Sequence, residues 1–140
     1  EAYKHEVVFV KLHEKVMEVV AELYQRLAKT HRMTGSYISS FVPAGAKSEA
    51  DRQADAYKAY TSCEHFYQEH AIYFDDEVCE KIDAFLKENK TIIIEFNDRK
   101  LSDSPTRTWV EVTKNFEANF KTLKQDLEKE FRKKVGVISE

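Results

Sequence analysis

Glycine and proline are scarce in this chain, which has three glycines and two prolines among 140 residues. With 34% charged and 42% hydrophobic residues, such a composition is typical of helices with solvated outer faces rather than of a disordered segment. The glycines, at positions 35, 45 and 136, are too scattered to form a glycine-rich phosphate-binding loop. We therefore expect one soluble helical domain spanning residues 1–140.

Cysteine is equally scarce, with only Cys63 and Cys79 present. A turn is expected near Phe74 and Asp75. At about 1.5 Å of rise per residue, Cys63 then lies about 16 Å before this turn and Cys79 about 6 Å after it. A disulfide requires Cα atoms within about 7 Å of each other. We therefore expect two free thiols and a reducing compartment, with the cytoplasm as the default location.

No hydrophobic run is long enough to span a bilayer, and no secretion signal is present. The 22 Lys and Arg residues are balanced by 25 Asp and Glu residues, giving a formal net charge of −3. This balance argues against a nucleic-acid or membrane partner, and the short basic clusters at 99–107 and 132–134 are interpreted as solvated surface. The apolar pattern is already established at Val7, which suggests an upstream segment that could serve as a membrane tether.

Apolar residues recur at helical spacing over four stretches, 2–39, 48–74, 75–96 and 104–135, and no stretch alternates like a strand. The spacing predicts an all-α, up-down antiparallel four-helix bundle whose first and last helices are long. The first stripe comprises His5, Phe9, Leu12, Val16, Val20, Leu23 and Leu27. Residues 91–96 have strand propensity, but a single strand would lack a partner, so helix is favoured over an extended segment.

Helix boundaries are indicated by capping residues. Ser48 is expected to cap the second helix and Asp75 the third, which makes these two helices a hairpin with a very short turn. Ser104 followed by Pro105 is expected to start the fourth helix. That helix is expected to end at Gly136, after three basic residues that favour a helix C-terminus.

The second helix is apolar on two sides. One side is formed by Ala56, Ala59, Cys63, Phe66, His70 and Tyr73, and the other by Tyr57, Tyr60 and Tyr67. The tyrosines either pack within the bundle with hydrated hydroxyls or form a surface for a subunit or partner. Exposure of the three rings distinguishes the two interpretations.

Reactive clusters are not evident in the sequence. None of the five histidines has Glu three residues before it, the spacing of dimetal helical bundles, so no metal site and no cofactor are predicted. Cys63 lies on a helix rich in aromatic residues, where apolar surroundings raise the pKa of a thiol and keep it unreactive. Cys79 lies near a helix start but lacks the partners of a catalytic triad. No catalytic residue is therefore predicted. The remaining candidate is a site in the bundle core formed by Cys63, Tyr67, His70 and Tyr73.

The segment from Lys11 to Thr30 reads KLHEKVMEVVAELYQRLAKT. It resembles the first helix of a group of bacterial all-helical proteins with a KLHEKxxEVxxELYxxL-type pattern. The later parts of that pattern correspond to 74–82 and 131–137, while Val16 stands where the group has arginine. The resemblance implies a helical fold with an N-terminal extension that is coiled-coil-like or membrane-associated. It implies no active-site residue, because the group has no assigned activity.

Two functions from different classes remain open. The first is a non-enzymatic interaction or scaffold module that self-associates or is tethered through its first helix, with Val7, Val8, Phe9 and Leu12 as the contact surface. The alternative is a small-ligand or metal-binding enzyme with its site in the bundle core. A regulatory role in host defence or signalling is a third hypothesis, which rests only on the resemblance.

Overall fold

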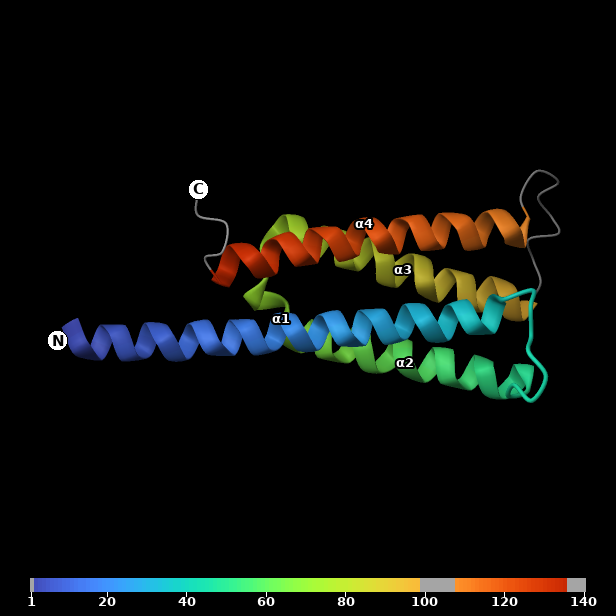
Figure 1. The fold of residues 1–140 in the computed structure, drawn as a ribbon, viewed down its shortest axis with the longest axis horizontal. Coiled ribbons are helices and arrows are strands. Elements are labelled where there is room, and N and C mark those ends of the chain that lie inside the picture. Colours follow the sequence, from blue (N-terminus) through green and yellow to red (C-terminus); the bar gives the residue numbers. More distant parts are fainter. Residues whose placement is uncertain (1, 99–107, 136–140) are drawn as a thin grey trace.

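The computed structural model describes the backbone of residues 2–98 and 108–135, and their side chains except at positions 2, 3, 5–7, 9 and 135. Within these ranges the chain forms four α-helices, with a 3-10 turn, η1 (Ala71–Tyr73), between the second and third. The helices are α1 (Ala2–Ile38), α2 (Glu49–His70), α3 (Asp76–Asp98) and α4 (Trp109–Val135). They alternate in direction, and α1 contacts both α2 and α4 (Figure 1). The predicted all-α antiparallel bundle is confirmed.

The predicted Ser48 cap is found at the start of α2. The Ser48 hydroxyl accepts a hydrogen bond from the Asp51 amide at 3.1 Å. The loop before Ser48 contains Gly45, whose φ of 83° suits a residue without a side chain. At the start of α3, the Cys79 amide donates to the main-chain carbonyl of Asp75 at 2.9 Å, which is a backbone bond of the first turn. Local side-chain chemistry therefore helps determine where α2 begins.

Three helix limits differ from the prediction. The second helix ends at His70 rather than 74, because Phe74 adopts an extended backbone and its ring is buried in the core. The third continues to Asp98, so residues 91–96 are helical as favoured. The fourth begins at Trp109, where the Thr108 hydroxyl accepts a hydrogen bond from the Glu111 amide at 3.2 Å. The expected Ser104–Pro105 start and the Gly136 end lie outside the described residues.

The core is continuous along the bundle, with apolar residues from all four helices. Phe85 of α3 stacks against Phe116 of α4 with ring centroids 5.7 Å apart. Deeply buried apolar side chains of the core include Val20, Leu23, Leu27, Tyr37, Ala56, Cys63, Ile82, Phe116 and Leu127. The first-helix stripe from Val20 onward thus belongs to the core, as its spacing indicates.

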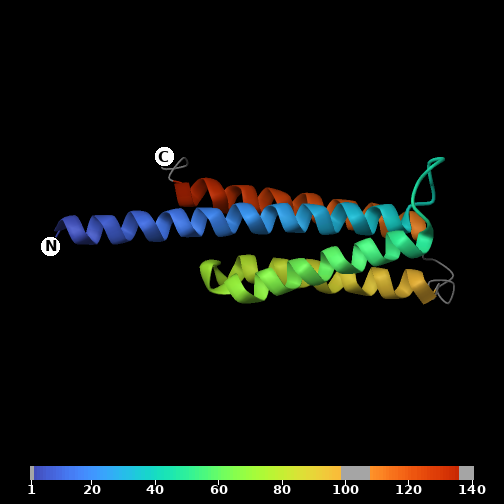
Figure 2. The same ribbon diagram turned by 90° about the horizontal axis from the view of Figure 1, so that it is seen from below.

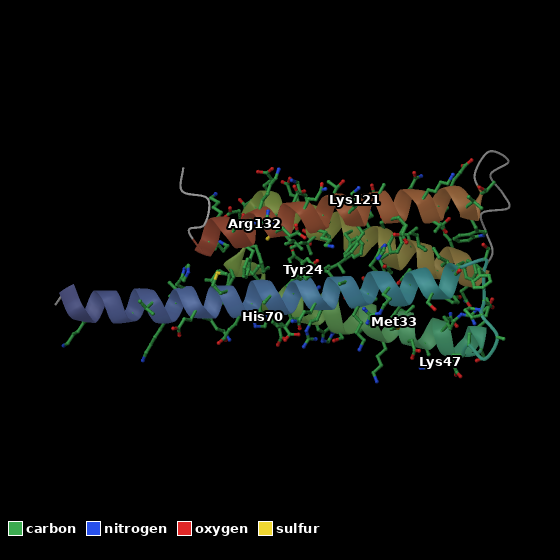
Figure 3. All side chains as sticks on the ribbon, in the orientation of Figure 1. Tyr24, Met33, Lys47, His70, Lys121 and Arg132 are labelled. Carbon is green, nitrogen blue, oxygen red and sulfur yellow. The ribbon has the colours of Figure 1, made fainter. Side chains whose placement is uncertain are left out.

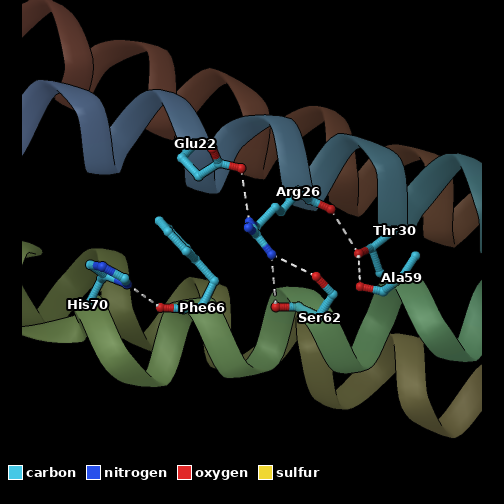
Figure 4. A network of polar contacts seen from close by, with 7 residues as sticks. All are labelled: Glu22, Arg26, Thr30, Ala59, Ser62, Phe66 and His70. Atoms are coloured by element: carbon cyan, nitrogen blue, oxygen red, sulfur yellow. Dashed lines mark hydrogen bonds and ion pairs between the residues drawn. The ribbon is translucent and has the colours of Figure 1, made fainter.

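Polar contacts join α1 to α2 on one side of the bundle (Figure 4). Arg26 forms an ion pair with Glu22 at 2.9 Å and donates to the Ser62 hydroxyl at 2.6 Å. The buried Thr30 hydroxyl donates to the Ala59 carbonyl at 3.1 Å. These directional contacts set the register of the two helices and satisfy polar groups at their interface.

The N-terminal part of α1 extends past the ends of the other three helices, as two perpendicular views show (Figures 1 and 2). The first buried side chain along α1, among those described, is Val19. We refer to residues 2–15 as the α1 projection. The same helix therefore has one segment outside the bundle, the α1 projection, and one segment inside it, residues 16–38, which we call the enclosed length.

Candidate functional site

The α1 projection exposes aliphatic side chains. Val8, Val10 and Leu12 are 66%, 51% and 56% exposed. Leu12 continues the stripe that Val16 and Val20 carry into the core, and Val8 lies about one turn before Leu12. The side chains of Val7 and Phe9, also predicted as part of this surface, lie outside the described ones. Apolar side chains thus continue along α1 past the end of the bundle, where they are exposed to solvent.

Charge is unevenly distributed along the same helix. Lys4, Lys11 and Lys15 of the projection are exposed, together with Glu14. The next turns carry Glu18, which is exposed, and Glu22, which holds Arg26. Lysines and glutamates therefore both occur in the projection, while the next two turns carry glutamates.

A groove between α1 and α4 begins where the projection meets the bundle. Its volume is about 580 Å³, and we call it the projection-end groove. Tyr24, labelled between the two helices in Figure 3, lies in its wall, and Arg132 lies at its rim. The remaining lining residues are Val20, Ala21, Gln25, Leu127, Glu128 and Phe131. The wall is largely apolar, although it is open to solvent.

A second groove between the same helices lies at the other end of the bundle and measures about 590 Å³. We call it the Trp109-end groove, after one of its lining residues. The cations Arg32 and Lys114 lie on opposite helices, and the remaining lining residues include His31, Ile38, Thr113 and Glu117. Arg32, Lys114 and Glu117 add charge to a wall that is otherwise mainly apolar.

His31 is the most unusual titratable group of the Trp109-end groove. Its ring stacks on Phe120 and Phe116, with centroids 4.1 and 4.7 Å apart, and its Nε2 lies 3.7 Å from a Glu117 carboxylate oxygen. Burial lowers the pKa of His31 from its ordinary value near 6.5, and the Glu117 carboxylate partly offsets this. Burial among aromatic rings disfavours the charged imidazolium, so the neutral form is favoured.

The structure corrects the expectation that Tyr57, Tyr60 and Tyr67 share one surface. Tyr57 is 51% exposed, but Tyr60 and Tyr67 are only 4% and 5% exposed. The Tyr60 hydroxyl donates to a Glu64 carboxylate oxygen at 2.7 Å, and the Tyr67 hydroxyl to the Cys79 carbonyl at 3.2 Å. Burial raises the pKa of both hydroxyls. Two of the three tyrosines therefore pack within the bundle, because this side of α2 faces α3.

The proposed core site is not brought together around a cavity. Cys63 is fully buried, and burial raises the pKa of its thiol to about 11. His70 Nδ1 lies 2.7 Å from the Phe66 carbonyl and the ring stacks on Phe66 (Figure 4). Cys63, His70 and Tyr73 line none of the described cavities, and Tyr67 lines one of about 270 Å³ beside Tyr60. Cys63 and Tyr67 pack in the core, whereas His70 stacks on Phe66 of its own helix.

The described side chains offer neither a metal-binding cluster nor an unpaired basic pair at the end of α4. Among the described residues, no group of three or more histidine, cysteine, aspartate and glutamate side chains is arranged to hold a metal ion. Cys63 and Cys79 are both free. Lys134 pairs with Glu130 at 3.0 Å and Arg132 approaches Glu128 at 4.0 Å, while the basic cluster at 99–107 lies outside the described residues. Within residues 2–98 and 108–135, no helix combines the length and apolar character that a membrane crossing requires.

Sequence reasoning did not identify either groove. Both are formed by α1 and α4, which are far apart in the chain, and neither carries a recognisable motif. The one available signal was the recurrence of small residues every seven positions, at Ala21, Ala28 and Gly35, on one face of α1. Comparisons with protein-family models, curated proteins and solved structures gave no match.

Proposed function

We propose that this protein is a non-enzymatic helical interaction module that self-associates through the α1 projection. The observation that carries the proposal is the exposure of Val8, Val10 and Leu12 on a helix extending past the bundle. Exposed apolar surface of this kind typically marks a protein contact.

The distribution of apolar residues on the projection supports this proposal. The projection is the first part of a continuous helix of 37 residues, and Val10 lies on a different face of it from Val8 and Leu12. A helix that is apolar on more than one face is typical of one covered by neighbours. Association would cover these side chains and stabilise the helix together.

The chemistry of the described residues is compatible with a non-enzymatic role. The buried thiol of Cys63 and the buried hydroxyls of Tyr60 and Tyr67 serve packing, and burial raises the pKa of each. We also propose that this role is cytoplasmic, because Cys63 and Cys79 are both free thiols.

Sedimentation velocity over a concentration series tests the proposal. We expect the wild-type chain to associate and the triple variant Val8→Ser, Val10→Ser, Leu12→Ser to remain monomeric. The matched control replaces three exposed aliphatic residues elsewhere, Val42, Ile94 and Val110, with serine. Circular dichroism establishes that each variant is folded. A wild-type chain that stays monomeric at about 1 mM, a concentration at which interactions of about −4 kcal/mol are half-saturated, would contradict the proposal.

The Trp109-end groove supports a second candidate function, the binding of a small anion with an aromatic body. Arg32 from α1 and Lys114 from α4 both line the groove, and Trp109, the only tryptophan of the chain, lies in its wall. Fluorescence of Trp109 therefore reports directly on occupancy. Titration with benzoate should change the emission of the wild-type chain but not of the Arg32→Gln, Lys114→Gln variant, and no change in either would refute this candidate.

A further inference from the structure

We propose that a groove between α1 and α2 binds the phosphate group of a small molecule, through Arg26 and Lys29 of α1 and Lys58 of α2. This groove shares no lining residue with the two grooves between α1 and α4. It also lies outside the α1 projection, so the site goes beyond the proposed self-association.

The groove has two adjoining parts, which we call together the α1–α2 groove. One part measures about 300 Å³ and the other about 210 Å³. Met33, Lys47 and Asp55 line both parts, and Met33 and Lys47 are labelled in Figure 3. A groove of this size accommodates a small ligand.

Positive charge is in excess in the wall of this groove. Its lining includes five cations, Arg26, Lys29, Lys47, Arg52 and Lys58, and one carboxylate, that of Asp55. Asp55 pairs with Lys47 at 2.9 Å and, with a smaller contribution from Asp51, raises the pKa of that lysine. The whole chain has a formal net charge of −3, so this groove has the opposite sign to the protein as a whole.

Two hydrogen bonds fix the helices that form the groove (Figure 4). The Thr30 hydroxyl donates to the Ala59 carbonyl at 3.1 Å, and Arg26 Nη1 donates to the Ser62 hydroxyl at 2.6 Å. Lys29 directly precedes Thr30, and Lys58 directly precedes Ala59. The contact between α1 and α2 therefore sets both lysines at one level of the groove, one on each helix.

The Arg26 guanidinium is held in place before any ligand binds. Its Nε donates to Glu22 at 2.9 Å, and its central carbon lies 4.7 Å from the centre of the Phe66 ring. Within the part of the chain that the structure describes, these bonds and those to Ser62 leave the two Nη2 donors without a partner. A fixed guanidinium loses little conformational entropy when it binds an oxyanion.

Lys29 and Lys58 supply the charge that the protein does not balance. Both are exposed, and neither forms an ion pair with any described residue, whereas Lys47 and Lys81 each pair with an aspartate. A phosphate monoester has a charge of about −1.5 to −2 at pH 7, which matches two free lysines. Its oxygens are also suitable acceptors for the Arg26 donors. We therefore favour a phosphate group over a singly charged carboxylate.

Isothermal titration calorimetry with glycerol 3-phosphate tests the site. The wild-type chain should bind it, and the variant Lys29→Gln, Lys58→Gln should bind about tenfold or more weakly. The matched control removes two exposed lysines of α4, Lys121→Gln, Lys124→Gln, and should retain affinity within about twofold. Equal weakening in the two variants, or no binding by the wild type at about 10 mM, would overturn the proposal.

Inorganic phosphate, titrated in parallel, distinguishes two sources of the same group. Tighter binding of glycerol 3-phosphate would assign the site to a phosphorylated metabolite, and equal affinity would assign it to the free ion. Both results support a phosphate site in the α1–α2 groove.

The variant Asp55→Asn provides a test that loss of folding cannot imitate. It removes the carboxylate of the groove and releases Lys47, so glycerol 3-phosphate should bind about threefold or more tightly. Unchanged or weaker binding would contradict this location of the site. The projection variant Val8→Ser, Val10→Ser, Leu12→Ser should bind like the wild type, so failure of the proposed self-association leaves this test intact.

Discussion

The two lengths of α1 carry the same apolar periodicity but have opposite surroundings. Leu23 and Leu27 are enclosed by the other three helices, whereas Val8 and Leu12 lie on a projection without such neighbours. Periodicity therefore specifies which face of a helix requires a partner. It does not specify whether that partner comes from the same chain.

The sharpest test of this comparison is truncation of one leucine in each length. Leu27→Ala should lower the free energy of unfolding by about 2–5 kcal/mol, because it removes buried contacts and leaves a cavity. Leu12→Ala should change the stability of the dilute monomer by less than about 0.5 kcal/mol. Urea denaturation at low micromolar concentration measures both. Equal losses would show that the projection is packed within the monomer.

A smaller effect is expected from the polar contacts that only the enclosed length makes. Thr30→Val removes the hydroxyl that donates to the Ala59 carbonyl, and should cost about 1 kcal/mol. Thr122→Val is the matched control, because its exposed hydroxyl donates only to the Ala118 carbonyl of its own helix. If both substitutions lower the stability equally in thermal denaturation, the hydrogen bond from Thr30 to Ala59 adds nothing to the stability of the fold.

A pH-dependent effect is expected at His31, which also lies in the enclosed length. Burial lowers the pKa of His31 in the folded state below 6.5, so the unfolded chain takes up the proton first as pH falls. The contribution of His31 to the unfolding free energy should therefore be complete above pH 6.5 and decrease below it. The variant His31→Phe should flatten this part of the profile.

Glu117 provides the complementary test of the same titration. Its carboxylate raises the pKa of His31, so Glu117→Gln should lower that pKa further and steepen the loss of stability under acid. A profile unchanged by either substitution would contradict the burial argument.

Much of the fold follows from local chemistry. The Ser48 cap, the helical course of residues 91–96 and the burial of the stripe from Val20 onward were all predictable from residue type and spacing. The end of α2 at His70 was not, because it depends on the buried position that Phe74 takes in the assembled bundle.

The candidate sites were less accessible to sequence reasoning. Tyr60 and Tyr67 were grouped with Tyr57 by spacing, but their burial depends on the position of α3 beside α2. The grooves between α1 and α4 depend on the packing of helices from opposite ends of the chain. Spacing along one helix contains no information on the distance between two helices.

Hydrogen–deuterium exchange at several protein concentrations tests the central claim most directly. In dilute solution, backbone amides of residues 4–15 should exchange much faster than those of residues 23–34, because the projection has no packed neighbour. As the concentration rises, the projection should gain protection while the enclosed length changes little. Exchange of residues 4–15 that is independent of concentration, at concentrations where the chain associates, would contradict the role of the projection.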